Sequence, residues 1–263
     1  MTTTIRALAF VFLLLLPAAA PAQDDPGETQ PLAKNTVDWS LGFGVFSSPR
    51  PYVGAEDFVM AIPLVEVNYK KLYVQGIQAG YHFIQNENFN FDVRAGIVFF
   101  GLEPDDSPFL EGMDPRASSI EGGLVFDWKP GKYMLRTTVA TDLLGRSNGQ
   151  QAAVDFSRMW QFHGRALGLM PSIGVVWQSS SFVDYYYGVT PGEARPWRPP
   201  FRGDSAINFR ASLLAYMFVS HRIRFVGLVE IQSFENEIFE SPIVDQRRGI
   251  FGLFGVTYRF GKL

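Results

Sequence analysis

Apolar and polar residues alternate along most of the chain, which is the pattern of a β-strand with two unlike faces. In the clearest run, 89–99, every second residue is apolar, and the residues between them include Asp92 and Arg94. Equally regular runs occupy 37–45, 120–128, 167–177, 207–217 and 254–260. Less regular runs occupy 60–69, 72–83, 133–143, 151–162 and 223–234. The pattern therefore predicts an all-β, antiparallel fold.

The length of these runs favours a membrane-spanning sheet. Tilted strands of about 10 residues cross the hydrocarbon layer, whereas strands of soluble proteins are typically about five or six residues long. Full charges occupy the face opposite the apolar one, at Asp92, Arg94, Arg136, Asp142, Asp155, Arg158, Arg210 and Glu230. In an outer-membrane barrel the apolar face contacts lipid and such charges line the lumen. We therefore predict a transmembrane antiparallel outer-membrane β-barrel.

The connections predict an even number of strands with both ends on one side. Short turns are expected at 85–88, 129–132, 163–165 and 220–222, and long loops at 101–116, 179–204 and 235–249. Short periplasmic turns and long outer loops are typical of such barrels, which have even strand numbers in bacteria. The eleven runs are thus one short, and Gly76 and Gly80 indicate an extra hairpin within 65–83. We predict 12 strands, with 10 as the alternative.

The N-terminal segment predicts export. Arg6 precedes an apolar run at 7–16, and small residues lead to a cleavage site between Ala22 and Gln23. The run is too short for a transmembrane helix, which needs about 20 apolar residues. We therefore expect a signal peptide, a flexible periplasmic segment and a barrel located in the cell outer membrane, at 1–22, 23–36 and 37–263, respectively.

Composition agrees with a sheet in contact with outer-membrane lipid. Charged residues make up 19% and aromatic residues 15% of the chain, against about 25% charged residues in ordinary soluble domains. The absence of cysteine rules out a disulfide-stapled scaffold. A net charge of -3 without a basic run argues against nucleic acid as a partner.

Candidate chemistry is sparse. His163 and His221 fall in expected turns and His82 near the end of a strand, so the long loops carry no histidine for a Ser-His-Asp arrangement. An acidic cluster in the first long loop offers carboxylates, but its spacing matches no calcium loop, and a solvated loop is the preferred interpretation. We predict no catalytic residue, no metal site, no cofactor and no enzymatic activity.

Two aromatic segments allow a binding interpretation. Tyr185, Tyr186 and Tyr187 are interpreted as aromatics at the membrane interface, which keep the ring in lipid and the hydroxyl in water. The segment 197–202, rich in Trp, Arg and Pro, is either a surface recognition patch or a loop folded into the barrel mouth.

Four segments resemble the MipA/OmpV family of outer-membrane proteins. They are 48–54 (SPRPYVG), 105–113 (DDSPFLEGM), 187–191 (YGVTP) with the following Glu193 and Ala194, and 241–244 (SPIV). Their order and spacing run through nearly the whole predicted barrel. One departure is at the C-terminus, where Phe260 is followed by Gly261, Lys262 and Leu263, although such barrels usually end on an aromatic residue.

The resemblance implies a non-enzymatic scaffold of the cell envelope. It implies a lytic transglycosylase and a penicillin-binding protein as partners, linked during peptidoglycan assembly. A passive channel for small solutes and a surface-exposed adhesin or antigen are the alternatives. The candidate interaction residues lie in the expected outer loops and are Asp105, Asp106, Ser107, Pro108, Tyr187, Gly188, Val189, Thr190, Pro191, Trp197, Arg198, Ser241 and Pro242.

Overall fold

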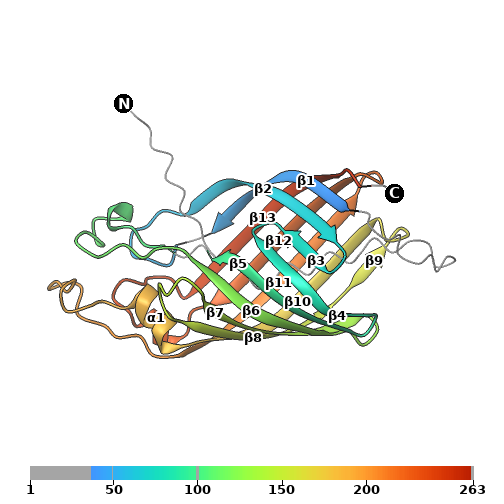
Figure 1. Cartoon of the computed structure of the whole chain (residues 1–263). Coiled ribbons are helices and arrows are strands. Elements are labelled where there is room, and N and C mark those ends of the chain that lie inside the picture. Colours follow the sequence, from blue (N-terminus) through green and yellow to red (C-terminus); the bar gives the residue numbers. More distant parts are fainter. Residues whose placement is uncertain (1–36, 49, 99–100, 262–263) are drawn as a thin grey trace.

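The strands form one antiparallel sheet that closes on itself (Figure 1). The computed structural model describes residues 37–48, 50–98 and 101–261, so the expected signal peptide, its cleavage site and the segment 23–36 lie outside the described residues. The strands are β1 (Asp38–Ser48), β2 (Phe58–Tyr69), β3 (Leu72–Gln75), β4 (Gln78–Gln85), β5 (Phe89–Val98), β6 (Ser119–Trp128), β7 (Tyr133–Asp142), β8 (Gln150–Arg158), β9 (Trp160–Phe162), β10 (Leu167–Gln178), β11 (Ala206–Phe218), β12 (Ile223–Ser233) and β13 (Arg248–Arg259). Consecutive strands pair with each other, except that β8 and β9 both pair with β10, and the pairing of β1 with β13 completes the barrel.

In the part of the chain that the structure describes, three short helices lie in the loops between strands. They are η1 (Pro104–Asp106), α1 (Ser180–Tyr187) and α2 (Asn236–Phe239). Among the described residues, none of the helices has the length and apolar character that crossing a membrane requires.

The segments β8 and β9 are two parts of one strand. Both pair with β10. The register of Ser172 with Ser157 continues unchanged to Leu169 with Trp160, so no residue is inserted or skipped between the two segments. The interruption lies opposite Pro171, which has no N–H group to donate to the ladder. Counting β8 and β9 as one strand gives 12 strands, which confirms the predicted number.

The twelfth strand comes from the extra hairpin predicted within 65–83. The sheet turns at Gly76 and Ile77, so that β3 and β4 replace the single run expected at 72–83. Gly76 has a φ of 58°, in the left-handed region that favours glycine. With this hairpin, both ends of the barrel lie at the same end as the short turns, as expected for a periplasmic end.

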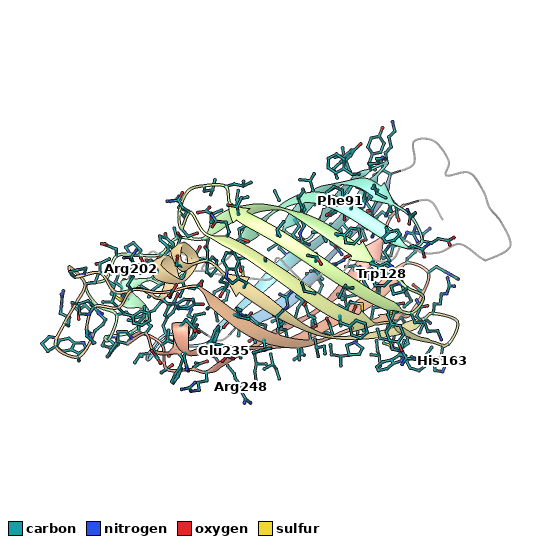
Figure 2. All side chains as sticks on the ribbon, turned by 90° about the horizontal axis from the view of Figure 1, so that it is seen from below. Phe91, Trp128, His163, Arg202, Glu235 and Arg248 are labelled. Carbon is teal, nitrogen blue, oxygen red and sulfur yellow. The ribbon has the colours of Figure 1, made fainter. Side chains whose placement is uncertain are left out.

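The two faces of the sheet have the predicted characters. Outward residues such as Phe43 and Ile173 are exposed at 67% and 65%, respectively, and form the lipid-facing surface. Inward charged residues such as Asp92 and Arg210 are buried, which confirms that these charges face the lumen. The prediction was wrong for Arg158, which lies on the outward face of β8 with Val154 and Phe156, over the rings of Tyr133 and Trp160. Figure 2 shows His163 at one end of the barrel and Arg202 at the other, with the strands between them.

A row of ion pairs crosses the lumen wall at one level. Arg136 on β7 donates two hydrogen bonds to Asp127 on β6, at 2.6 and 2.8 Å. Arg210 on β11 pairs with Asp155 on β8, across the intervening strand β10. The residue of β10 at this level is Gly174, where a Cβ would lie 2.1 Å from the Asp155 Oδ1 atom. The missing side chain of Gly174 therefore provides the space for the second ion pair.

A chain of amide hydrogen bonds lies nearer the outer end. Asn208 donates to Gln178 at 2.9 Å, Gln178 to Gln151 at 3.1 Å, and Gln151 to Glu121 at 2.6 Å. These side chains come from β11, β10, β8 and β6. Buried polar groups need such partners to offset the loss of water, so this wall of the lumen is held by mutual hydrogen bonding.

Candidate functional site: the cap over the outer mouth

Loop segments from four parts of the chain come together beyond the outer ends of the strands. We call this assembly the cap, and it comprises 50–57, 101–118, 179–205 and 234–247. In Figure 1 the cap lies on the left, and the short turns lie on the right. Its buried apolar residues belong to the same hydrophobic cluster as Phe46 and Val176, near the outer ends of β1 and β10. The cap is therefore packed onto the barrel mouth.

Helix α1 forms because its first turn is capped. The Ser179 hydroxyl accepts hydrogen bonds from the N–H groups of Phe182 and Gln150, at 3.4 and 2.9 Å, and thereby joins the helix to β8. The helix buries Phe182, Val183, Tyr186 and Tyr187. The interpretation of Tyr186 and Tyr187 as membrane-interface aromatics was therefore wrong, because their rings form part of the core of the cap.

Tyr52 joins three of the cap segments. It is 1% exposed, and its hydroxyl donates a hydrogen bond to the Tyr186 carbonyl at 3.2 Å. Its backbone forms a bridge with Val244, while the Ser241 hydroxyl donates to the Tyr187 carbonyl at 2.6 Å. A further contact attaches 101–118, because the Ser107 hydroxyl donates to the Val53 carbonyl at 2.7 Å. The four segments that carry the family resemblance thus meet in one place.

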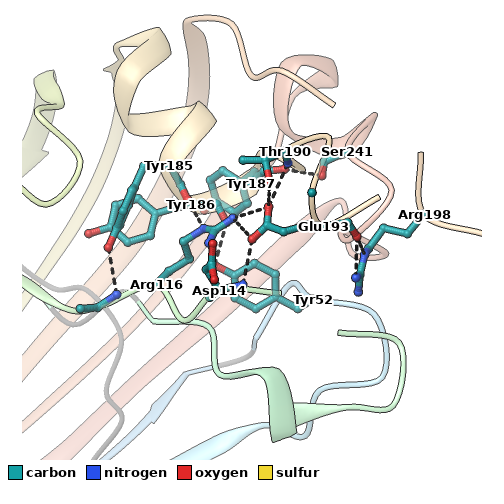
Figure 3. Close-up of polar contacts among 12 residues, drawn as sticks. Tyr52, Asp114, Arg116, Tyr185, Tyr186, Tyr187, Thr190, Glu193, Arg198 and Ser241 are labelled. Carbon is teal, nitrogen blue, oxygen red and sulfur yellow. Dashed lines mark hydrogen bonds and ion pairs between the residues drawn. The ribbon is translucent and has the colours of Figure 1, made fainter. Parts of the chain in front are cut away.

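A buried ion pair lies at the centre of the cap (Figure 3). The Arg116 Nη2 atom donates to both carboxylate oxygens of Glu193, at 2.8 and 3.0 Å. Arg116 also donates to the Tyr185 carbonyl at 2.7 Å. Glu193 further accepts hydrogen bonds from the N–H groups of Thr190 and Asp114, both at 2.9 Å. Each charge is therefore compensated by partners from two loops that are distant in sequence.

Arg198 links the same two loops through backbone carbonyls. Its side chain donates to the carbonyls of Glu193, Phe109 and Glu111 and is fully buried. The segment 197–202 was interpreted either as a surface recognition patch or as a loop folded into the barrel mouth. The burial of Arg198 supports the folded loop at this residue. Trp197, in contrast, is 61% exposed.

The predicted interaction residues divide into three groups by burial. Those buried in the cap are Ser107, Tyr187, Gly188, Val189, Arg198 and Ser241, and those exposed on its surface are Asp105, Pro108, Thr190, Pro191 and Trp197. Asp106 and Pro242 are partly buried, and Asp106 pairs with Arg50. Arg116 and Glu193, which lie 77 positions apart, are not among the predicted interaction residues, although Glu193 belongs to a segment that carries the family resemblance.

Two of the remaining candidate groups, His82 and Asp106, have structural partners. His82 faces the lumen and lies 2.6 Å from the Asp92 carboxylate. In the first long loop, Asp106 also accepts a hydrogen bond from the Glu103 N–H group at 2.9 Å. Within the described residues, no three His, Asp or Glu side chains are arranged to hold a metal ion.

Burial sets the protonation states of the cap. It raises the pKa values of the Tyr52, Tyr186 and Tyr187 hydroxyls, which are therefore neutral. Burial acts in the same direction on Glu193, but the hydrogen bonds from Thr190, Asp114 and Arg116 outweigh it and lower the pKa of this carboxyl. Glu193 is therefore the charged partner that Arg116 requires.

We expect acid to loosen the cap. Because the pKa of Glu193 is lowered, its stabilising effect is present above the usual value of 4.5 and is lost as the pH falls further. Hydrogen exchange of the peptide around Glu193, corrected for the intrinsic effect of pH, should accelerate below this pH. A Glu193→Gln variant should exchange faster at neutral pH and lack the acid step attributable to this group. An equal acid step in the variant would contradict the assignment.

A closed sheet with an apolar outer face, a charged lumen and a capped mouth defines a membrane-spanning β-barrel. The family model described as MltA-interacting protein MipA matches residues 41–260. The chain therefore belongs to the MipA family.

Two relatives and one solved structure are similar to this chain. The MltA-interacting protein of Escherichia coli is 27% identical over 231 residues, which cover 84% of this chain and 90% of the relative. YiaT of Escherichia coli, named as an outer membrane protein, is 25% identical over 224 residues with the same coverage. A crystal structure of an outer membrane channel from Pseudomonas putida F1 is 10% identical, has a TM-score of 0.45, and covers 90% of this chain and 100% of that chain. The closed sheet, the family and the relative named as an outer membrane protein together make this protein an outer-membrane barrel.

Proposed function

We propose that this protein is an anchored scaffold of the cell envelope that binds a lytic transglycosylase at its periplasmic end. The observation that carries the proposal is the cap, because interlocked loops with a buried ion pair over the outer mouth favour a closed barrel over a passive channel. The name of the Escherichia coli relative, MltA-interacting protein, supports the choice of partner. A penicillin-binding protein is the proposed second partner, which would link hydrolase and synthase in peptidoglycan assembly.

The short turns offer a surface for such partners. Their cations, which we call the basic rim, are Lys70, Lys71, Lys129, Lys132, Arg165 and Arg222, and Glu87 is the acidic residue of these turns. Apart from the half-buried Lys129, the side chains of the rim are exposed. A surface of one charge sign selects partners of the opposite sign and accelerates their association. We therefore propose that the partner presents an acidic surface to the basic rim.

Reversing the charge of the basic rim should weaken binding of the lytic transglycosylase. In full-length protein in lipid nanodiscs, changing Lys70, Lys71, Lys129 and Lys132 to Glu should lower the affinity for the lytic transglycosylase MltA by about tenfold or more. Binding of the unmodified protein should also weaken with added salt. The matched control reverses the charge of four exposed acidic residues of the cap by changing them to Lys; these are Asp57, Asp105, Asp204 and Asp245. Failure of the unmodified protein to bind the enzyme would contradict the scaffold, and equal effects of both variants would contradict the basic rim.

The exposed part of the cap is a separate candidate surface. Asp105, Pro108, Thr190, Pro191 and Trp197 face outward, away from the periplasm. An exposed Trp amid Pro and Arg residues has the character of a binding hot spot. We propose that these residues make the external contacts that the predicted interaction loops were expected to provide, independently of the periplasmic scaffold.

A further inference from the structure

The backbone hydrogen bonding between neighbouring strands of the barrel wall is interrupted beside β2. Strand β3 pairs with β2 only at 66–69, and β3 and β4 end at the turn formed by Gly76 and Ile77. Above this turn, the segment 58–64 of β2 continues toward the outer end with a partner only on the β1 side, among the strands that the structure describes. In Figure 1 the far-wall strands β12 and β13 are visible between β2 and β5, to the left of the β3–β4 hairpin.

The register fixes which backbone groups meet this interruption. The Val65 carbonyl accepts a hydrogen bond from the Gly76 N–H group at 2.7 Å, so Val65 directs its backbone groups away from β1. Because these directions alternate along an antiparallel strand, Val59, Ala61 and Pro63 direct theirs to the same side. Pro63 has no N–H group, and proline is confined to such edges within sheets. The sequence of β2 is therefore adapted to a free edge.

The free edge is long enough to matter in a membrane. Seven residues, 58–64, span about 23 Å at the usual rise of a strand. Membrane barrels normally leave no such edge, because an unpaired backbone group in hydrocarbon costs several kcal/mol. Within the described residues, β2 and β5 do not become neighbouring strands above the hairpin.

The inward face beside the free edge is apolar. Met60, Ile62 and Leu64 of β2 face the lumen and belong to, or pack against, one hydrophobic cluster with inward residues of the adjoining strands. These neighbours are Phe46 on β1, Phe251 and Leu253 on β13, and Val226 and Leu228 on β12. A polar lumen wall is held by ion pairs on β6, β7, β8 and β11. The lumen thus has an apolar wall, and this wall begins at the interruption.

From these features we propose a lateral portal between β2 and β5, through which an acyl chain of a surrounding membrane lipid enters and lies against the apolar wall. The cap covers the axial route from outside, so the portal connects the lumen to the outer-leaflet half of the membrane. The apolar residues of β2 would contact the acyl chain, and the polar wall would remain hydrated. This role is distinct from partner binding at the basic rim.

Lipid quenching of a fluorophore tests the portal. The chain lacks cysteine, so single-cysteine variants can be labelled with bimane in nanodiscs whose phosphatidylcholine carries a nitroxide on the acyl chain. The test position is Ile62, which faces inward beside the free edge. Leu228 is the inward control, because β12 is paired on both sides at this residue. Phe43 is the lipid-facing control.

We expect bimane at Ile62 to be quenched nearly as strongly as at Phe43 and several-fold more than at Leu228. Quenching at Ile62 no greater than at Leu228 would overturn the portal. If Ile62→Cys does not fold, Met60→Cys provides a second inward position on β2. An independent measurement is hydrogen exchange, in which the Ala61 amide should exchange several-fold faster than that of Ile62. Equal protection of the two amides would also overturn the portal.

Discussion

Replacing Arg116 with alanine is expected to open the outer mouth. The substitution leaves the Glu193 carboxylate buried without its cation, and breaking a buried ion pair in this way costs about 3–5 kcal/mol. It also removes hydrogen bonds to the Tyr185 and Asp114 carbonyls. Because these groups join 101–118 to 179–205, the loops should separate while the strands remain paired.

Planar-bilayer recording measures this opening. The unmodified protein should give no reproducible single-channel steps, whereas Arg116→Ala should conduct and still migrate as a folded barrel on unheated gels. Arg202→Ala is the matched control, since Arg202 is an arginine of the partner loop 179–205 but is exposed. Arg116→Met with Glu193→Met should conduct less than the single variant, because no buried charge is left unpaired. Steps of equal size in the unmodified protein would contradict the closed cap.

Replacing Gly174 with alanine is expected to prevent or strongly weaken barrel formation. The new Cβ would lie 2.1 Å from the Asp155 Oδ1 atom and 2.7 Å from the Val154 carbonyl oxygen. Asp155 must then leave Arg210, and the loss is again about 3–5 kcal/mol for a buried pair. In an unconstrained strand the same substitution would stabilise the protein by about 0.4–1 kcal/mol, because alanine lowers the conformational entropy of the unfolded chain.

The effect of Gly174→Ala can be measured by urea unfolding in detergent and by the fraction that folds on dilution. Gly252→Ala is the matched control, since Gly252 lies on β13 and a Cβ there meets nothing within 4 Å. The midpoint should fall sharply for Gly174→Ala and stay constant or rise slightly for Gly252→Ala. Equal midpoints for the two variants would contradict the proposed role of Gly174 in the ion-pair row.

The sequence was informative about the wall of the barrel because its alternation is local. Strand positions, the lipid-facing parity and the inward charges follow from a period of two, which any strand of a two-faced sheet must show. The extra hairpin was located because glycine marks the turn at Gly76. The interruption between β8 and β9 was missed, because its cause is Pro171 on the opposite strand.

The cap could not be derived in the same way. Its contacts join residues far apart in the chain, such as Arg116 with Glu193 and Tyr52 with Tyr186, and no periodicity connects them. The three consecutive tyrosines were placed at the membrane interface because an amphipathic ring fits either location. Only the capped helix α1 orients Tyr186 and Tyr187 toward the core. The family resemblance marked these segments without showing that they meet.

The long-range contacts of Tyr52 imply an order of folding. Tyr52 contacts Tyr186 and Val244, which come from the second half of the chain. Non-local contacts of this kind form late, because they require the intervening chain to be arranged first. The cap can therefore be completed only after segments from both halves of the chain have been brought together. An intact cap thus distinguishes a chain whose two halves have met from one still being assembled.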